Sequence, residues 1–512
     1  MSRDREEAAY FKGLYSSRGF IGAAVFLISI IFLYWISADI LEIAGDEGIY
    51  LEGGRRIAAG QQAYRDFFVL TGPLTFWIEG VLARVSGTAL VAMRLPMILD
   101  AAFLTWAVYW LASRYSSALY SAGAAVAFLA YESQTRLLYV NHRWDSAALA
   151  TSAIMAALAA RPSNRRRWWL MCGILCAAAA WATPSLVIVA VPLLAWSLAR
   201  SRATGLAFLA GGALTTAACA SYLAGHGALR PMMQSLAWTA ANYTAPNRVS
   251  YGNVWAGASP HLAQWEYLPA TILYMLPALL TPAAIVGWAL YCRKPERRAG
   301  AEEIWFLLAS AAALTLAAWP RWSSDTLLHT MALSWFLCAW LLYRITPPGQ
   351  RVLWCGAVLL VAAVTLAGKA ISPLPYAAQE TRVGTLHDPN DSGEILERLE
   401  DRVKPGDTLF SFPYLPSAYF YLDARNPTRY TFLQPGMMNP EDERRAIQEL
   451  QANPPRWVLY ENFPPEAVFR IWPESDPSRI PMAAMNSYIR EHYRQVDTAG
   501  GVRSSLILLE RY

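Results

Sequence analysis

Charged residues are scarce in this 512-residue chain. They make up 16% of it, whereas hydrophobic residues make up 55% and the mean hydropathy is +0.24. A water-soluble domain usually has about a quarter of its residues charged, so an ordinary soluble enzyme is disfavoured. Disorder is also excluded, because this much apolar surface must be buried. The net charge of +5 is small and does not indicate a nucleic-acid-binding protein.

Cysteine is sparse as well, and several catalytic motifs are missing. All six cysteines lie in or beside apolar stretches, and the polar C-terminal part has none. This excludes a disulfide framework or a cysteine zinc site there. The sequence has no P-loop, no Gly-x-Gly-x-x-Gly motif after a strand and no Ser-His-Asp signature. A nucleotide-driven pump and a soluble nucleotide-sugar enzyme therefore have no support.

Long apolar runs, in contrast, are frequent. A stretch of about 20 apolar residues can cross a bilayer. Eleven candidate spans are present: 19–38, 92–112, 117–132, 145–160, 168–183, 184–200, 204–224, 267–292, 303–320, 328–343 and 352–371. Basic residues gather in the loops of one side: Arg114, 161–167, Arg200 with Arg202, 293–298, and Arg344 with Arg351. Because basic loops face the cytoplasm, we expect the N-terminus inside and, after an odd number of crossings, the C-terminal part outside.

Besides an outer segment at about 225–266, rich in tryptophan and tyrosine as expected at a headgroup boundary, two long polar parts lie on the expected outer side. The first, residues 39–91, holds an apolar repeat from Leu74 to Val85 behind Pro73, which predicts a helix lying in the membrane interface. The second begins with an expected linker at 372–390 and continues as a small α/β domain at 391–512. Its expected elements are strands near 407–411, 456–460 and 504–509, and helices near 391–403, 441–451 and 483–494. The predicted fold class is an all-α polytopic membrane protein, residues 1–371, with about 11 transmembrane helices and a small C-terminal α/β domain.

Two adjacent acids, Asp46 and Glu47, follow the first span. A carboxylate at the membrane surface can take the proton of an incoming hydroxyl, a step that typically contributes about 10²–10⁴ in rate. In a structural alternative, Asp46 caps a short helix and Glu47 lies in its first turn. The two interpretations are compatible.

A second polar cluster, His142, Arg143 and Asp145, lies where the fourth span begins. Acids in or at the end of a span are costly and usually have a function or a partner. The alternative is that Asp145 caps the span and pairs with Arg143.

A third cluster, Arg321, Asp325 and His329, precedes the tenth span at steps of four residues. This spacing would place all three on one helical face. Arginine is suited to binding phosphate through paired hydrogen bonds, and the alternative is an ordinary ion pair on a helix surface. All three clusters are expected on the outer side, where a water-soluble nucleotide donor is absent, so a donor there must arrive on a lipid.

These residues resemble the GT-C superfamily of polytopic glycosyltransferases, particularly the branch with protein O-mannosyltransferases and bacterial aminoarabinose transferases. Three features carry the resemblance: the pair Asp46-Glu47, the stretch from Gly60 through Phe67 followed by Gly72-Pro73-Leu74, and Asp145 at the start of the fourth span. The clear overlap covers about residues 20–200. One departure is that Pro184 follows Thr183, where many relatives have a lysine.

The resemblance implies an integral membrane glycosyltransferase whose donor is a sugar on polyprenyl phosphate. It would transfer the sugar to an acceptor hydroxyl by an inverting single displacement, with Asp46 as the base. Glu47 and Asp145 would complete the catalytic group, and Arg143, Arg321 and His329 would bind the donor phosphate. Residues expected to support the acceptor or the structure are Tyr64, Asp66, His142 and Asp325. No metal is inferred, because Asp46 and Glu47 have no convincing third ligand beside them.

Two alternatives stay open. One is a flippase for a lipid-linked sugar, and the other is a membrane anchor that presents the C-terminal domain as a binding module. The acceptor is a glycan, a lipid or a protein hydroxyl. Frequent arginine and alanine with only four lysines indicate a GC-rich bacterial genome, so we expect a bacterial inner-membrane protein with a periplasmic C-terminal domain.

Overall fold

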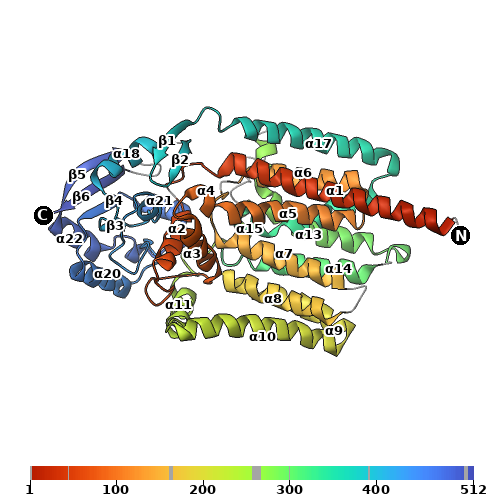
Figure 1. Cartoon of the computed structure of the whole chain (residues 1–512), viewed down its shortest axis with the longest axis horizontal. Coiled ribbons are helices and arrows are strands. Elements are labelled where there is room, and N and C mark those ends of the chain that lie inside the picture. The colour runs from red at the N-terminus through yellow and green to blue at the C-terminus, as the bar shows by residue number, and fades with distance from the viewer. Residues whose placement is uncertain are drawn as a thin grey trace.

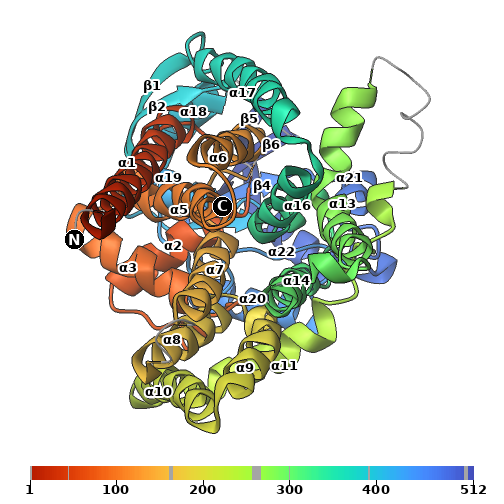
Figure 2. The ribbon, with the colours of Figure 1, turned by 90° about the vertical axis from the view of Figure 1, so that its right-hand side faces the viewer.

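Helices dominate the structure, a computed structural model that describes residues 3–43, 45–135, 137–160, 165–255, 267–298, 300–389, 392–500 and 505–512. The long helices of residues 3–371 form what we call the helical body. They are α1 (Arg3–Ser37), α5 (Leu95–Ser113), α6 (Ala118–Glu132), α7 (His142–Ala160), α8 (Arg166–Ala182), α9 (Ala190–Arg200), α10 (Arg202–Gly225), α13 (Leu268–Tyr291), α14 (Ala301–Leu316), α15 (Ser324–Thr330), α16 (Ala332–Ile345) and α17 (Pro348–Ile371). Most of these helices run side by side along the long axis of the molecule (Figures 1 and 2), whereas the short α15 is bent away from α16.

Each of the eleven expected spans coincides with one of these helices or with a consecutive pair. Among the described residues, five helices are long and apolar enough to cross a membrane, within Arg18–Ser37, Leu90–Ser113, Arg202–Gly225, Ala270–Tyr291 and Pro348–Ile371. The pair α15 and α16 adds a sixth if it counts as one span, although it is bent by 73°. The predicted fold class is confirmed, while the count of eleven crossings stays a prediction.

Shorter elements lie between the helical body and the C-terminal region, residues 372–512 (Figure 1). They are α2 (Glu47–Ala58), α3 (Leu74–Ser86), α4 (Leu90–Met93) and α11 (Leu229–Asn242), and the short 3₁₀ turns η1 (Pro184–Val189) and η2 (Pro295–Arg297) lie elsewhere in the body. The predicted helix behind Pro73 is α3. Its Val81 and Val85 are exposed, whereas Trp77 and Leu82 of the same apolar stripe pack against the core. Its place in the membrane interface stays a prediction.

The C-terminal region contains two sheets. The hairpin of β1 (Ala377–Thr381) and β2 (Gly384–Asp388) lies within the expected linker. The larger sheet has the order β3-β4-β6-β5, formed by β3 (Leu409–Phe412), β4 (Trp457–Glu461), β6 (Ser505–Arg511) and β5 (Tyr493–Gly500). Strands β3 and β4 are parallel, and the other pairs are antiparallel. The helices are α18 (Ser392–Arg402), α19 (Ser417–Tyr421), α20 (Pro440–Ala452), α21 (Pro465–Ile471) and α22 (Ala483–His492), with the 3₁₀ turn η3 (Pro477–Arg479).

The three expected strands and three expected helices of this region are therefore confirmed. Local signals explain some of them: α20 begins with Pro440 behind a capping box made by Asn439 and Asp442. Strand β5 was not expected, and only its first two residues, Tyr493 and Arg494, fall in the helix expected at 483–494.

The C-terminal region docks tightly onto α2. A Cβ atom added at Gly48 would lie 2.0 Å from the backbone nitrogen of Ser417, so only glycine permits this approach. The Ser417 hydroxyl donates a hydrogen bond to the Ile43 carbonyl. Apolar residues of α2, α3 and the C-terminal region share one core, which includes Leu51, Phe76 and Tyr419. The loop that carries Asp46 is thus held between the two parts of the molecule.

Candidate active site between the helical body and the C-terminal region

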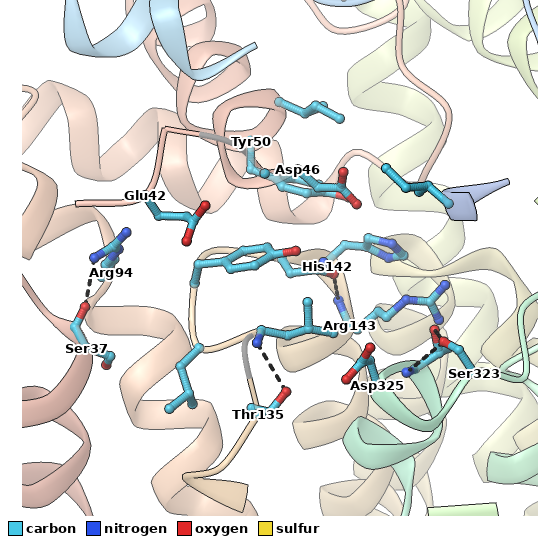
Figure 3. Close-up of a pocket in the computed structure, with 18 of the residues that line it drawn as sticks. Ser37, Glu42, Asp46, Tyr50, Arg94, Thr135, His142, Arg143, Ser323 and Asp325 are labelled. Atoms are coloured by element: carbon cyan, nitrogen blue, oxygen red, sulfur yellow. Dashed lines mark hydrogen bonds between the residues drawn. The ribbon is translucent and has the colours of Figure 1, made fainter. Parts of the chain in front are cut away.

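A cavity of about 1,020 Å³ lies where the helical body meets the C-terminal region. The body contributes its charged lining residues, which include Glu42, Asp46, Arg143, Arg321 and Asp325. Figure 3 shows Asp46 and Arg143 on the same side of this cavity, with Arg94 and Ser37 on the opposite side. The three clusters expected from the sequence therefore each contribute at least one residue to a single cavity.

Asp46 is half-buried and lines the cavity. It occupies the N-cap position of α2, but its side chain makes no capping hydrogen bond. Instead, its Oδ1 accepts a hydrogen bond of 2.8 Å from the Tyr414 hydroxyl. The capping interpretation is thus wrong for the side chain. The carboxylate is held by a residue of the C-terminal region and is presented to the cavity.

Three further tyrosines line the cavity near Asp46: Tyr50, Tyr139 and Tyr243. Burial raises the pKa of each hydroxyl above its ordinary value, and the negative charge of Asp46 raises the pKa values of Tyr50 and Tyr139 further. All three therefore stay protonated at neutral pH and can donate hydrogen bonds to a ligand without adding negative charge.

Two arginines face the cavity from separate segments. Arg143 lies in the first turn of α7. Arg321 lies before α15, where its Nη2 donates to the Ile471 carbonyl at 3.0 Å. Its Nη1 is buried and has no hydrogen-bond partner. A buried unpaired guanidinium nitrogen is costly, and an anionic ligand in the cavity would satisfy it.

The expected helical face of the third cluster is only partly correct. Ser323 caps α15, and its side chain accepts from the backbone of Thr326, so the helix begins after Arg321. Asp325 and His329 do share this helix, but only Asp325 lines the cavity. His329 is 1% exposed, and its ring packs edge-on against Trp144 at 4.5 Å between centroids. Because His329 does not line the cavity, its position does not support the predicted contact with the donor phosphate.

Glu47 is buried, and both of its carboxylate oxygens accept hydrogen bonds from the protein. Its two oxygens accept from Arg94 Nε at 2.8 Å and Nη2 at 2.6 Å, and Oε1 also accepts from the backbone of Val140 at 3.0 Å. Arg94 further donates to the carbonyls of Ser37 and Ile40. Glu47 is therefore placed to hold α2 against α1 and α5 rather than to meet a ligand.

Asp145 lies in the first turn of α7 and is 7% exposed. Its described partners are the Thr75 hydroxyl of α3 and the carboxyl group of Asp100, so the alternative pairing with Arg143 is wrong. The buried Glu79 lies close enough for its pKa to be raised by the charge of Asp145, although burial itself is the larger cause. Asp145 thus lies beneath the cavity wall, in a cluster of acids.

His142 does line the cavity, and its Nδ1 lies 2.6 Å from the Thr183 hydroxyl. That hydroxyl also donates to Ser146 at 2.9 Å. Thr183, the residue before the departure at Pro184, is therefore connected to the site through His142.

Tyr64 and Asp66 support the loop instead of the cavity. Tyr64 is 1% exposed, has φ of 68°, and donates from its hydroxyl to the Thr71 carbonyl at 2.6 Å. Asp66 accepts from Arg65 and from the backbone of Gln62. Both therefore fix the shape of residues 60–72. Within the described ranges, no three histidine, cysteine or acidic side chains are placed to hold a metal ion.

Several lining residues were not expected from the sequence. The C-terminal region supplies Tyr414, Phe432, Gln434, Ile471 and Trp472, and the end of α17 supplies Lys369. No local pattern marks these residues, because each lies far along the chain from Asp46.

No family model matches the sequence, and no curated protein matches it either. The fold does match solved structures. ArnT from Cupriavidus metallidurans, bound to undecaprenyl phosphate, aligns with a TM-score of 0.56 and 13% identity over 97% of this chain and 98% of that one. The same protein in the apo state gives 0.57 and 12% over 96% and 98%.

A second neighbour is the Archaeoglobus fulgidus oligosaccharyltransferase tethered to an acceptor peptide. It aligns with a TM-score of 0.50 and 11% identity over 95% of this chain and 74% of that one. At these identities the likeness establishes the fold. The chain therefore shares the fold of ArnT and of this oligosaccharyltransferase, which agrees with the fold that the resemblance implied.

Proposed function

We propose that this protein is an integral membrane glycosyltransferase that moves a sugar from a polyprenyl-phosphate carrier to an acceptor hydroxyl. The observation that carries the proposal is the cavity itself. It brings the presented carboxylate of Asp46 together with Arg143 and with Arg321, whose Nη1 has no partner. A carboxylate and two guanidinium groups are what a displacement at a phosphate-linked sugar requires.

The proposed reaction is a single displacement. Asp46 takes the proton of the acceptor hydroxyl while the acceptor oxygen forms a bond to the anomeric carbon. The bond between that carbon and the phosphate oxygen breaks, and the carrier phosphate leaves with the electron pair. Arg143 and Arg321 stabilise the charge that develops on the leaving phosphate. Attack opposite the leaving group inverts the anomeric configuration.

The fold supports a lipid-linked donor. One neighbour with this fold was solved with undecaprenyl phosphate bound, and the cavity lies at the end of helices that are long and apolar enough to cross a membrane. We place the N-terminus in the cytoplasm of a bacterium and the C-terminal region in the periplasm, because the basic loops carry the positive-inside signal. The N-terminus lies at the end of the body remote from the C-terminal sheet (Figure 1).

The test is turnover of labelled polyprenyl-phosphate sugars by purified protein, with crude envelope extract as the source of acceptor. The wild type should release carrier phosphate, and Asp46→Asn, which keeps the size of the side chain, should lose that release by about 10²-fold or more. Asp401→Asn is the matched control, because Asp401 is an exposed carboxylate on α18, and it should behave as the wild type.

Other outcomes separate the alternatives. Equal turnover by wild type and Asp46→Asn would remove Asp46 from catalysis. Movement of the intact sugar lipid across a liposome bilayer, without release of carrier phosphate, would establish the flippase instead.

A further inference from the structure

The cavity has two chemically different walls. We call five of the lining residues from the C-terminal region the roof: Tyr414, Phe432, Gln434, Ile471 and Trp472. None of them carries a charge at neutral pH, whereas the rest of the lining includes Asp46, Arg143 and Arg321. The two arginines suit the phosphate of a donor, so the uncharged roof is left for the second substrate.

Gln434 is the polar group of this roof. Its side chain is 2% exposed, and its Nε2 is buried without a hydrogen-bond partner. Buried amide groups in folded proteins are nearly always paired, and leaving one unpaired costs stability. An oxygen atom of a ligand in the cavity would supply the missing acceptor.

The roof is attached directly to Asp46. The backbone of Leu433 donates to the Pro413 carbonyl at 2.8 Å, so the segment with Phe432 and Gln434 lies beside Tyr414. The Phe432 and Tyr414 rings are 5.0 Å apart, and the Tyr414 hydroxyl donates to Asp46. A ligand that accepts a hydrogen bond from Gln434 would therefore lie along the wall that ends at the proposed base.

Contacts with the helical body fix the roof in place. Arg321 donates to the carbonyl of Ile471, the residue before Trp472. Arg479 bridges Asn242 of α11 and the Met437 carbonyl at 3.1 and 3.2 Å. The aromatic side chains also contact each other, with Tyr414 and Trp472 centroids 5.2 Å apart. The roof is thus held in place by contacts that do not depend on a ligand.

We infer that the roof is the subsite for a neutral saccharide acceptor, whose ring hydroxyls pair with Gln434 while its apolar face lies against the aromatic residues. The roof itself supplies no cation to pair with an anionic acceptor. A small uncharged ring with many hydroxyl groups matches a wall made of aromatic rings and one amide. This inference rests on the proposed function, in which the acceptor oxygen bonds to the anomeric carbon, its proton goes to Asp46 and the carrier phosphate leaves.

The experiment measures binding without turnover, by saturation-transfer NMR on the full-length protein in nanodiscs. The probes are methyl α-D-mannopyranoside, methyl β-D-galactopyranoside and methyl β-D-glucopyranoside, with glycerol 3-phosphate and N-acetyl-threonine-N-methylamide as anionic and peptide comparisons. At least one glycoside should receive saturation from the protein, and more strongly than either comparison compound.

Gln434→Met should weaken glycoside binding about tenfold, since it removes the hydrogen bond to the ligand and keeps the volume. Its melting temperature should equal or exceed that of the wild type, because the deleted donor has no partner in the protein. Gln448→Met, at an exposed position of α20, should bind as the wild type. Gln434→Glu provides a second variant that lacks the donor, and it should also bind weakly.

Three results would overturn the inference: no glycoside binds, a comparison compound binds better than every glycoside, or both Gln434 variants bind as the wild type. A measurement of donor turnover distinguishes failure of this inference from failure of the proposed function. Turnover without glycoside binding defeats the inference alone, and glycoside binding without any donor turnover defeats the transferase alone.

Discussion

Replacing Glu47 with glutamine separates a structural role of this carboxylate from a catalytic one. The sequence pairs Glu47 with Asp46, but the structure gives the two neighbours different surroundings. Asp46 meets the cavity, whereas Glu47 and Arg94 are each 1% exposed and form a bidentate ion pair. We therefore expect Glu47→Gln to act on stability first.

The magnitude follows from what the substitution leaves behind. Arg94 keeps its hydrogen bonds to the carbonyls of Ser37 and Ile40, but its buried charge loses the opposing carboxylate. Removing one partner of a buried ion pair typically costs about 3–5 kcal/mol. The amide oxygen can still accept from Val140, so we place the loss at the lower end, about 3 kcal/mol.

The assay is reversible unfolding in mixed micelles, followed by turnover per folded molecule. The control is Glu394→Gln, which breaks the exposed pair of Glu394 with Arg398 and should cost less than about 0.5 kcal/mol. Turnover per folded Glu47→Gln molecule should stay within about threefold of the wild type. Loss of turnover at unchanged stability would refute the structural role and return Glu47 to the catalytic group.

Two further predictions concern the contact between Asp46 and the C-terminal region. Tyr414→Phe removes the 2.8 Å hydrogen bond to Asp46, so kcat should fall about tenfold or more at a nearly unchanged donor KM; an unaltered kcat would show that Asp46 needs no such partner. Gly48→Ala places a Cβ atom 2.0 Å from a backbone nitrogen, so it should undock the C-terminal region, making it sensitive to limited proteolysis and abolishing turnover. Gly225→Ala, where nothing lies within 4 Å, is its control, and equal protease resistance of both variants would contradict the docking argument.

The sequence predicts the helical body well because a bilayer imposes a strong local constraint. Every span needs a continuous apolar stretch, and α10 and α17 satisfy that constraint without help from their neighbours. Strands β3, β4 and β6 of the C-terminal region are also local apolar runs. By contrast, the hairpin of β1 and β2 has little apolar sequence of its own, and its register depends on pairing across the chain.

The candidate site was predictable only where its chemistry is local. Asp46 stands out because it is one of two adjacent acids shortly after an apolar span, but its partner Tyr414 is 368 positions away. The sequence contains no sign of that contact, since long-range packing creates it. The prediction that Arg321 shares a helical face with Asp325 and His329 failed for a simpler reason. Ser323 is a favourable N-cap, so the helix begins after Arg321.

Both the helical body and the C-terminal region contribute residues to the site. This decides which experiment can distinguish an enzyme from a membrane anchor that presents a C-terminal binding module. Deleting residues 372–512 should abolish function under both hypotheses. For the anchor it removes the binding module, and for the enzyme it removes Tyr414 from Asp46 and the Ile471 carbonyl from Arg321. Only a substitution in the first loop distinguishes them. Asp46→Asn leaves the C-terminal region folded, so it should be silent in an anchor and inactivating in the transferase.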